Sequence, residues 1–273
     1  NSTALFQINA ARTATLTLGT CQAGAGYAVV IQTGAGSVLT FVNTTFIGGT
    51  GSFCYGLYAG IGCTLTFTNC TATGGSGTSA HGVSPGVAGV TASGTLNLTQ
   101  SASTGANSAA FYPTAGSGSL SGSVVHRSAG NTWRNEGGTW DYTITSETIT
   151  GSIIGSGNQG LWMVLGSGVS TITRPAGTIT HSVATHYGFK LSGAGVLTIV
   201  GDVTCGTNGS NYVAYDASAG AGSVTVNGTV TGPSTSFGSP TGLAAATSGK
   251  VFVKNVTVGA AGTLPSLTNV CFM

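Results

Sequence analysis

Charged side chains are scarce in this sequence of 273 residues: Lys and Arg number 7, Asp and Glu number 5, and together they make up 4% of the chain. Soluble domains are on average about one quarter charged. A net charge of +2 cannot supply the row of phosphate contacts that DNA or RNA binding needs, so we expect no nucleic-acid partner. Disordered chains combine low hydrophobicity with high charge, and this chain is 41% hydrophobic, so disorder is excluded as well.

Long hydrophobic runs and cysteine pairs are also missing. The apolar run at 161–165 is far shorter than the roughly 20 residues of a spanning helix, so we expect no membrane span. No Cys-x-x-Cys pair occurs, and we predict no metal site and no cofactor. The even number of Cys permits disulfides outside a cell, but buried free thiols are the simpler interpretation. The six residues are Cys21, Cys54, Cys63, Cys70, Cys205 and Cys271.

What the sequence does contain is a repeat of about 27 residues, rich in its 47 Gly. The segments 169–195, 196–222 and 223–249 align without gaps, and roughly ten such units cover nearly the whole chain. We expect a single domain over 1–273, with an irregular coil at 119–141, where the pattern breaks. Because the first residue is Asn1 and not Met, we also expect a processed product or part of a longer chain.

Each unit contains three short stretches of strand-like sequence. Apolar residues alternate with Thr at 39–41 and 224–226, a period of two that is typical of a strand with one buried face. A second stretch, such as 229–231, and a third, such as 187–190, follow Gly/Ser-rich turns. Three strands and three corners per unit predict an all-β, right-handed parallel β-helix (a β-solenoid) of about ten coils. We expect these residues to point inward: Leu39, Phe41, Leu65, Phe67, Trp140, Tyr142, Leu197, Ile199, Val224 and Val226.

Several units share short motifs: Tyr55–Tyr58, then Gly60-Ile61-Gly62, then Thr-Leu-Thr-Phe-Thr-Asn at 64–69, and Ser-Val-Thr-Val-Asn-Gly-Thr-Val-Thr-Gly at 223–232. In these motifs the chain resembles the Gly/Ser/Thr-rich β-helix arrays of phage tail fibres, tailspikes and bacterial surface adhesins. The resemblance implies a structural or adhesive module, extracellular or on a virion surface. It implies as partners other copies of the chain or other fibre chains, with a surface glycan as a candidate ligand.

Charge concentrates at one place, where Trp133, Arg134, Glu136 and Asp141 lie close together in the sequence. Two carboxylates about 5–10 Å apart are what glycoside hydrolysis requires, and some families that the repeat resembles cut polysaccharides. A polysaccharide-degrading glycosidase or lyase is therefore the alternative function, with these four residues as secondary site candidates. The competing interpretation, which we prefer, is that Asp141 replaces a Thr of an outer ladder. We predict no enzyme and assign no catalytic residue.

The third strand supplies the main ligand-binding candidates. The residue after the inward apolar one is Tyr58, Trp162, Lys190 or Tyr215 in different coils. Alternation would turn these side chains outward, and pairing of successive coils would set three of them about 5 Å apart. Exposed rings suit stacking on sugars, and Lys190 could hold an acidic group. The alternative is a subunit contact, where Tyr and Trp are also enriched.

A second alternative function comes from Thr pairs in the second strand. Thr-x-Thr recurs at 148–150, 178–180 and 229–231, and Asp202 interrupts the array. In this one feature the chain resembles the β-solenoid antifreeze proteins, which implies ice binding.

Overall fold

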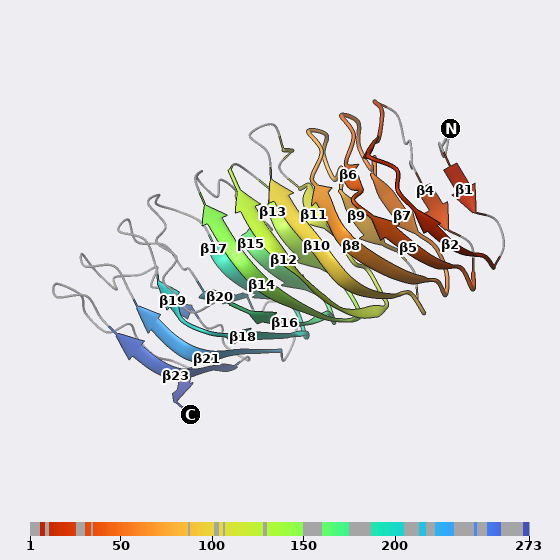
Figure 1. The fold of residues 1–273 in the computed structure, drawn as a ribbon. Helices are drawn as coiled ribbons and strands as arrows, with labels where there is room; N and C mark the ends of the chain where they lie inside the picture. Colours follow the sequence, from red (N-terminus) through yellow and green to blue (C-terminus); the bar gives the residue numbers. More distant parts are fainter. Residues whose placement is uncertain are drawn as a thin grey trace.

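A computed structural model shows an all-β solenoid whose ends carry the two termini (Figure 1). Successive turns of the chain place parallel strands side by side, which confirms the parallel β-solenoid predicted from the repeat. None of the described residues forms a helix long and apolar enough to span a membrane. The structure describes residues 6–8, 11–25, 31–33, 35–86, 88–100, 104–105, 107–127, 130–149, 160–174, 187–204, 213–216, 222–231, 243–244, 250–257 and 270–272, with the backbone alone at 6–7, 31–33, 160, 187, 204, 213–216 and 230–231 and from 243 onward.

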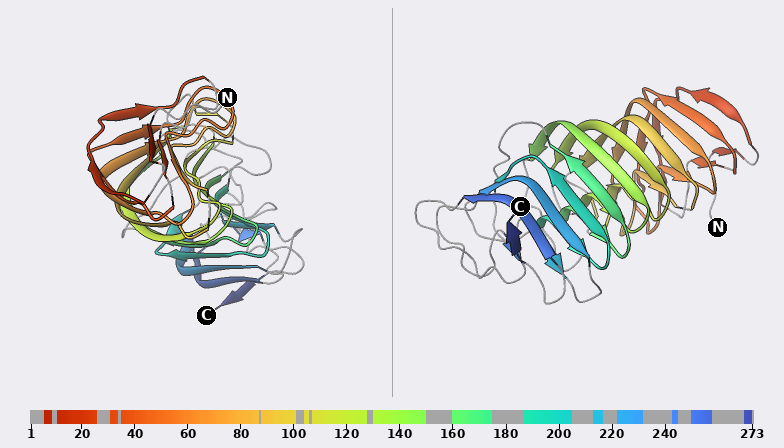
Figure 2. Two further views of the ribbon diagram at one scale, coloured as in Figure 1. Left: turned by 90° about the vertical axis from the view of Figure 1, so that its right-hand side faces the viewer. Right: turned by 90° about the horizontal axis from the view of Figure 1, so that it is seen from below.

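Two sheets run along the solenoid (Figure 2). Sheet A contains ten strands: β1 (Phe6–Ile8), β4 (Ile31–Thr33), β7 (Leu57–Ala59), β9 (Val83–Pro85), β11 (Ala109–Phe111), β13 (Asn131–Asn135), β15 (Gly160–Leu165), β17 (Tyr187–Ser192), β20 (Val213–Asp216) and β22 (Leu243–Ala244). Sheet B contains fourteen: β2 (Thr13–Leu16), β3 (Thr20–Gln22), β5 (Val38–Val42), β6 (Thr45–Ile47), β8 (Thr64–Thr73), β10 (Thr91–Gln100), β12 (Ser117–His126), β14 (Thr139–Ile149), β16 (Val169–Thr173), β18 (Val196–Val200), β19 (Val203–Thr204), β21 (Ser223–Thr231), β23 (Lys250–Thr257) and β24 (Val270–Phe272).

The strand register follows the sequence repeat. Thr64 pairs with Thr91, and Val196 pairs with Ser223, each one unit further along the chain. The segment 119–141, where the sequence pattern breaks, does not interrupt the sheets, because β12, β13 and β14 all keep their places in the ladders. What changes there is the corner between β12 and β13, which is shortened to 127–130. The coil is short at that corner, and the ladder between β12 and β14 also shifts its register between Gly122 and Ser123.

Alternate residues of the sheet B strands point into the interior, as predicted. Leu39 pairs with Leu65 and Phe41 with Phe67, and all four side chains are buried, as are the other six predicted inward residues. The rings of Phe41 and Phe67 stack at 5.9 Å, and Phe46 meets both edge-on. Each such ring removes a large apolar area from water, and this burial is the main force that holds one coil on the next.

Sheet A contributes an aromatic ladder to the same interior. Phe111 pairs with Trp133, Trp133 with Trp162, and Trp162 with Phe189. The ring centroids of these successive pairs are 4.6, 6.0 and 6.4 Å apart. The indole N–H of Trp133 donates to Ser170 Oγ, so the buried polar edge of that ring is satisfied.

The corners depend on residues that accept unusual backbone conformations. Asn43 and Asn69 lie at the bend within sheet B with φ of 47° and 51°, and the Asn69 amide donates to Asn43 Oδ1 at 2.8 Å. Gly62 has φ of 60° in the turn that precedes β8. At Gly77 the need is different, because a Cβ there would lie 2.1 Å from the carbonyl oxygen of Gly51 in the preceding coil.

Four of the six cysteines lie within the described residues with their side chains. Cys21, Cys54, Cys63 and Cys70 are buried as thiols, which confirms the simpler interpretation for these four. Burial raises the pKa of Cys21 and Cys70. Cys205 and the side chain of Cys271 lie outside the described residues.

The inward assignment predicts a strong effect for Val226→Asp. Val226 is buried between its ladder partners Ile199 and Val253, so the variant places an unpaired carboxylate in the apolar interior. We expect the free energy of unfolding, measured by urea denaturation, to fall by several kcal/mol.

The matched control is Thr225→Asp. Thr225 faces outward in the same ladder that contains Asp141, so this fold already accepts an Asp in that row. A Val226→Asp protein as stable as the Thr225→Asp protein would show that the inward assignment is wrong.

Candidate functional site

The outward row of sheet A is not the row predicted from the sequence. Trp162 pairs with Phe189, whereas Lys190 pairs with Met163 and Tyr215 pairs with Leu191. Trp162, Lys190 and Tyr215 therefore belong to three different ladders. Trp162 points into the core with an exposed fraction of 0%, and Lys190 is only 4% exposed. The predicted exposed row is wrong in register and in exposure, and the side chain of Tyr215 lies outside the described residues.

The error has a physical cause. Leu161, Trp162, Met163 and Val164 are all fully buried, so both faces of sheet A are covered at this strand. Where both faces are buried, apolar residues no longer alternate with polar ones, and the sequence does not reveal which side chain points inward. The observed outward row is Tyr58, Ser84, Tyr112, Arg134, Met163 and Lys190.

Aromatic and charged side chains gather on the N-terminal half of this row. We call the group the Tyr–Arg face; its members are Tyr55, Tyr58, His81, Tyr112, Arg134 and Glu136. The rings form a continuous stack: Tyr58 and Tyr55 are 5.7 Å apart, Tyr55 and His81 5.4 Å, and His81 and Tyr112 3.9 Å. The guanidinium of Arg134 lies over the Tyr112 ring at 5.6 Å. The three tyrosines are half-buried, so part of each side chain remains accessible.

An ion pair closes the end of the stack. Arg134 Nη2 lies 2.7 Å from Glu136 Oε1, and the Tyr112 hydroxyl donates to Glu136 Oε2 at 2.8 Å. Burial raises the pKa of Tyr112, and the carboxylate of Glu136 adds to the effect. Three groups from two coils are thus held in one geometry, which is the preorganisation that a binding surface requires.

His81 lies at the centre of the stack, and its side chain is 1% exposed. Its Nδ1 accepts a hydrogen bond from the Ala109 backbone N–H at 3.0 Å. Nδ1 therefore carries no proton, and the neutral ring is protonated on Nε2. Burial lowers the pKa of His81 well below its ordinary value, and the nearby Arg134 acts in the same direction.

The sequence did contain a signal for Tyr112. It follows inward Phe111 as Tyr58 follows inward Leu57. The signal was missed because the unit at 90–118 is longer than 27 residues, which shifts the alignment. Tyr58 and Arg134 were predicted as candidates, and the structure brings both to this face.

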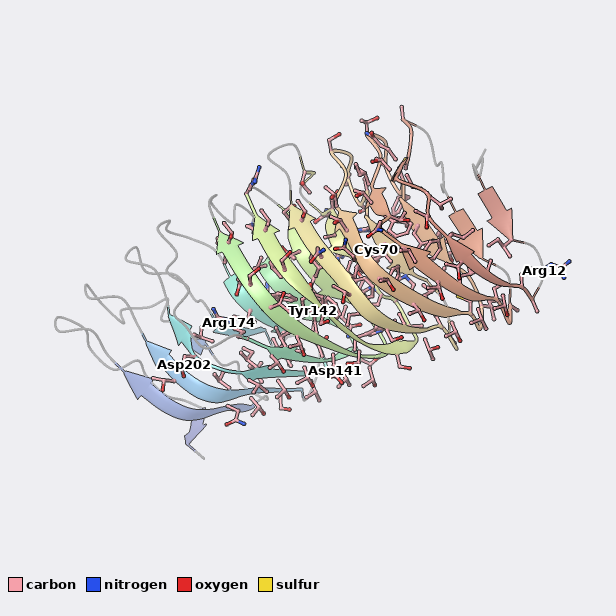
Figure 3. All side chains as sticks on the ribbon, in the orientation of Figure 1. Arg12, Cys70, Asp141, Tyr142, Arg174 and Asp202 are labelled. Carbon is pink, nitrogen blue, oxygen red and sulfur yellow. The ribbon has the colours of Figure 1, made fainter. Side chains whose placement is uncertain are left out.

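The secondary candidates separate onto different parts of the solenoid. Trp133 is buried in the aromatic ladder, and Arg134 and Glu136 belong to the Tyr–Arg face. Asp141 is exposed on the outer face of sheet B, between Ser119 and Thr171 in the ladder (Figure 3). It therefore does replace an outer-ladder hydroxyl residue, as the preferred interpretation predicted. Glu136 is bound to Arg134 and Tyr112, whereas Asp141 lies in the outer ladder of sheet B.

A second pair of charges lies inside the solenoid. The side chains of Glu147 and Arg174 are 2% and 1% exposed, and Arg174 Nε is 3.5 Å from Glu147 Oε2. Glu147 points inward because its ladder partner is the buried Val124. Burial raises the pKa of Glu147, while Arg174 opposes that shift. Because both charges are withdrawn almost completely from water, this pair carries a desolvation cost and is a poor source of stability.

The Thr array falls largely outside the described residues, which exclude Thr150, Thr178 and Thr180 and the side chain of Thr231. Thr148 is exposed, and the carboxylate of Asp202 accepts the backbone N–H of Thr229 at 2.8 Å. The strands of sheet B turn steadily along the solenoid (Figures 1 and 2). A turning face matches a flat crystal plane over a few coils only. Within the described residues, no three His, Cys, Asp or Glu side chains form a group that could hold a metal ion.

The interior ion pair yields a prediction about stability. Glu147→Gln leaves Arg174 buried without a counter-charge, so the free energy of unfolding should fall by about 3–5 kcal/mol. The double variant Glu147→Met/Arg174→Met replaces both charges with apolar groups and should recover most of that loss. Urea denaturation measures both changes.

Asp141→Asn is the control, because it removes an exposed carboxylate and should change stability by no more than about 0.5 kcal/mol. A double variant less stable than Glu147→Gln would mean that the charge pair itself stabilises the solenoid.

No protein-family model matches the chain, and neither does any curated protein or solved structure. The function proposed next therefore depends on the fold and on the residues of the Tyr–Arg face.

Proposed function

We propose that the chain is a structural and adhesive β-helix module of a phage fibre or spike, or of an extracellular surface fibre, and that it contacts a surface glycan through the Tyr–Arg face. The module acts outside the cell or on a virion, beside copies of itself or other fibre chains. We propose a right-handed solenoid of about ten coils, which the ten-stranded path of sheet A supports.

The low charge of the surface supports association with other chains. Only 12 of 273 residues are Lys, Arg, Asp or Glu, and Glu147 and Arg174 lie in the interior. A surface with few charges offers little repulsion between neighbouring molecules. Long parallel ladders also make a stiff rod, which suits a protein that holds a binding surface away from its point of attachment.

The observation that carries the glycan proposal is the composition of the Tyr–Arg face. Tyr55, Tyr58 and Tyr112 are partly exposed beside Arg134 and Glu136, on a chain that is rich in Gly, Thr and Ser. The ring faces are largely occupied by one another. Sugar hydroxyls would therefore meet ring edges, tyrosine hydroxyls and the charged groups, which is a hydrogen-bonding form of recognition.

The double variant Tyr58→Ala/Tyr112→Ala tests the face. We expect binding to a glycan array to be lost while sedimentation shows an unchanged oligomeric state. The matched control is Thr64→Ala/Thr91→Ala, which removes two exposed and hydrogen-bonded hydroxyls from the outer face of sheet B and should leave glycan binding intact.

Loss of assembly with retained glycan binding would instead identify the face as a subunit contact, where Tyr and Arg are also enriched. If neither property changes, the proposed role of the face is wrong.

The two alternative functions have their own measurements. New reducing ends, released from a polysaccharide by the parent and not by Glu136→Gln or Asp141→Asn, would establish the glycosidase or lyase alternative. Shaping of ice crystals would establish ice binding.

A further inference from the structure

We propose that His81 is an acid-sensitive latch of the Tyr–Arg face: its protonation separates the coil of β9 from the coil of β11 and loosens the ring stack while the rest of the solenoid stays folded. The inference adds regulation to the proposed binding site, and its first test requires no ligand.

The hydrogen bond at Nδ1 is a contact that only a neutral ring can make. The Ala109 backbone N–H donates to Nδ1, and a proton on Nδ1 would set two donors against each other. The ring also lies between Tyr55 and Tyr112, at 5.4 and 3.9 Å. A charged ring in that buried position loses its hydration without gaining an acceptor for the new proton.

The charged groups around the ring oppose protonation as well. Arg134, on the far side of Tyr112, is close enough to help lower the pKa of His81. The carboxylate that could compensate is Glu136, and it is already held by Arg134 and Tyr112. Tyr55 and Tyr112 are neutral near pH 7, because burial raises the pKa of both. Among the described residues, no acidic group in direct contact with His81 balances a positive ring.

The direction of the pH effect follows from these contacts. A His with a depressed pKa in the folded state stabilises that state fully above the pKa of unfolded His, about 6.5, and the contribution is lost as the pH falls. His81 joins two neighbouring coils at a corner, whereas the interior ladders are held by stacked Phe and Trp rings. Local opening therefore requires less free energy than unfolding of the whole solenoid.

Hydrogen exchange at single amides tests the latch in the intact chain. We expect the protection factor of the Ala109 amide to fall between about pH 7 and about pH 4, by up to about tenfold for each pH unit below the pKa of an accessible His, about 6.5. The protection of the Trp133 amide, in the interior part of β13, should stay constant over the same range.

His81→Asn is the informative variant, since its Oδ1 can replace Nδ1 as the acceptor and it does not titrate. We expect the Ala109 amide of this variant to lose the acid response. The control is His126→Asn, because His126 is also buried, with Nδ1 3.1 Å from Thr132 Oγ1. The His126→Asn protein should respond to acid as the parent does.

Three results would overturn the proposal: an acid response that survives in His81→Asn, one that disappears in His126→Asn, or protection lost at Ala109 and Trp133 together. A nitrogen-15 titration of the histidines in the unmodified chain provides a check that needs no variant. It should show His81 as the neutral Nε2–H tautomer until the Ala109 amide opens, and a protonated His81 with Ala109 still protected would also overturn the proposal.

A glycan-array measurement near pH 7 and near pH 4 then connects the latch to binding. We expect bound glycan to be released from the parent in acid and retained by His81→Asn. An acid response at Ala109 without any glycan binding at either pH would leave the latch intact and contradict the proposed function instead.

Discussion

Parallel pairing between coils is the constraint on which the rest of this structure depends. Each residue lies about 4.8 Å from its counterpart in the next coil, so a choice made at one position is repeated along the axis. Phe41 on Phe67 and Trp133 on Trp162 are two results of this repetition, and the Asn43–Asn69 amide pair is a third. Each interior residue packs on its counterparts in the preceding and the following coil. A polar residue in the interior therefore leaves two contacts unfavourable, and apolar side chains dominate there.

Polar or charged residues that depart from the repeat find an interaction partner in the adjacent coil. Glu147 has its counter-charge on Arg174, the hydroxyl of Tyr112 reaches Glu136, and the carboxylate of Asp202 accepts the N–H of Thr229. His81 follows the same rule through Ala109. In each case the two residues are separated by about one repeat in the sequence, so a coil with an unusual residue and the next coil form a matched pair. A single coil could not be exchanged for another without breaking such a match.

The sequence predicted the inward residues of sheet B better than those of sheet A, because the two sheets differ in their exposure to solvent. One face of sheet B is exposed to solvent, so Thr alternates with Leu, Val and Phe. This period of two residues identified the side chains that point inward. At Leu161–Val164 both faces are covered, the alternation vanishes, and Trp162 was assigned to the wrong side. The sequence identified only Tyr58, Arg134 and Glu136 of the Tyr–Arg face. Tyr112 was missed because its repeat unit is longer than 27 residues, which shifts the alignment. The inward turn of Glu147 could not be foreseen either, since it depends on the register shift between Gly122 and Ser123.

The two largest changes in coil length leave the starts of the sheet B strands paired. Ser117 and Thr139 are partners although the intervening coil is short, and Thr139 and Val169 are partners although theirs is long. The turns before β8, β10, β12 and β14 each contain a Gly with positive φ: Gly62, Gly89, Gly116 and Gly138. Four residues separate β12 from β13, whereas ten separate β14 from β15. For protein engineering, the segment between a sheet B strand and the next sheet A strand is the natural position at which to graft a foreign epitope or a catalytic loop, because its length differs between coils whose strands remain paired.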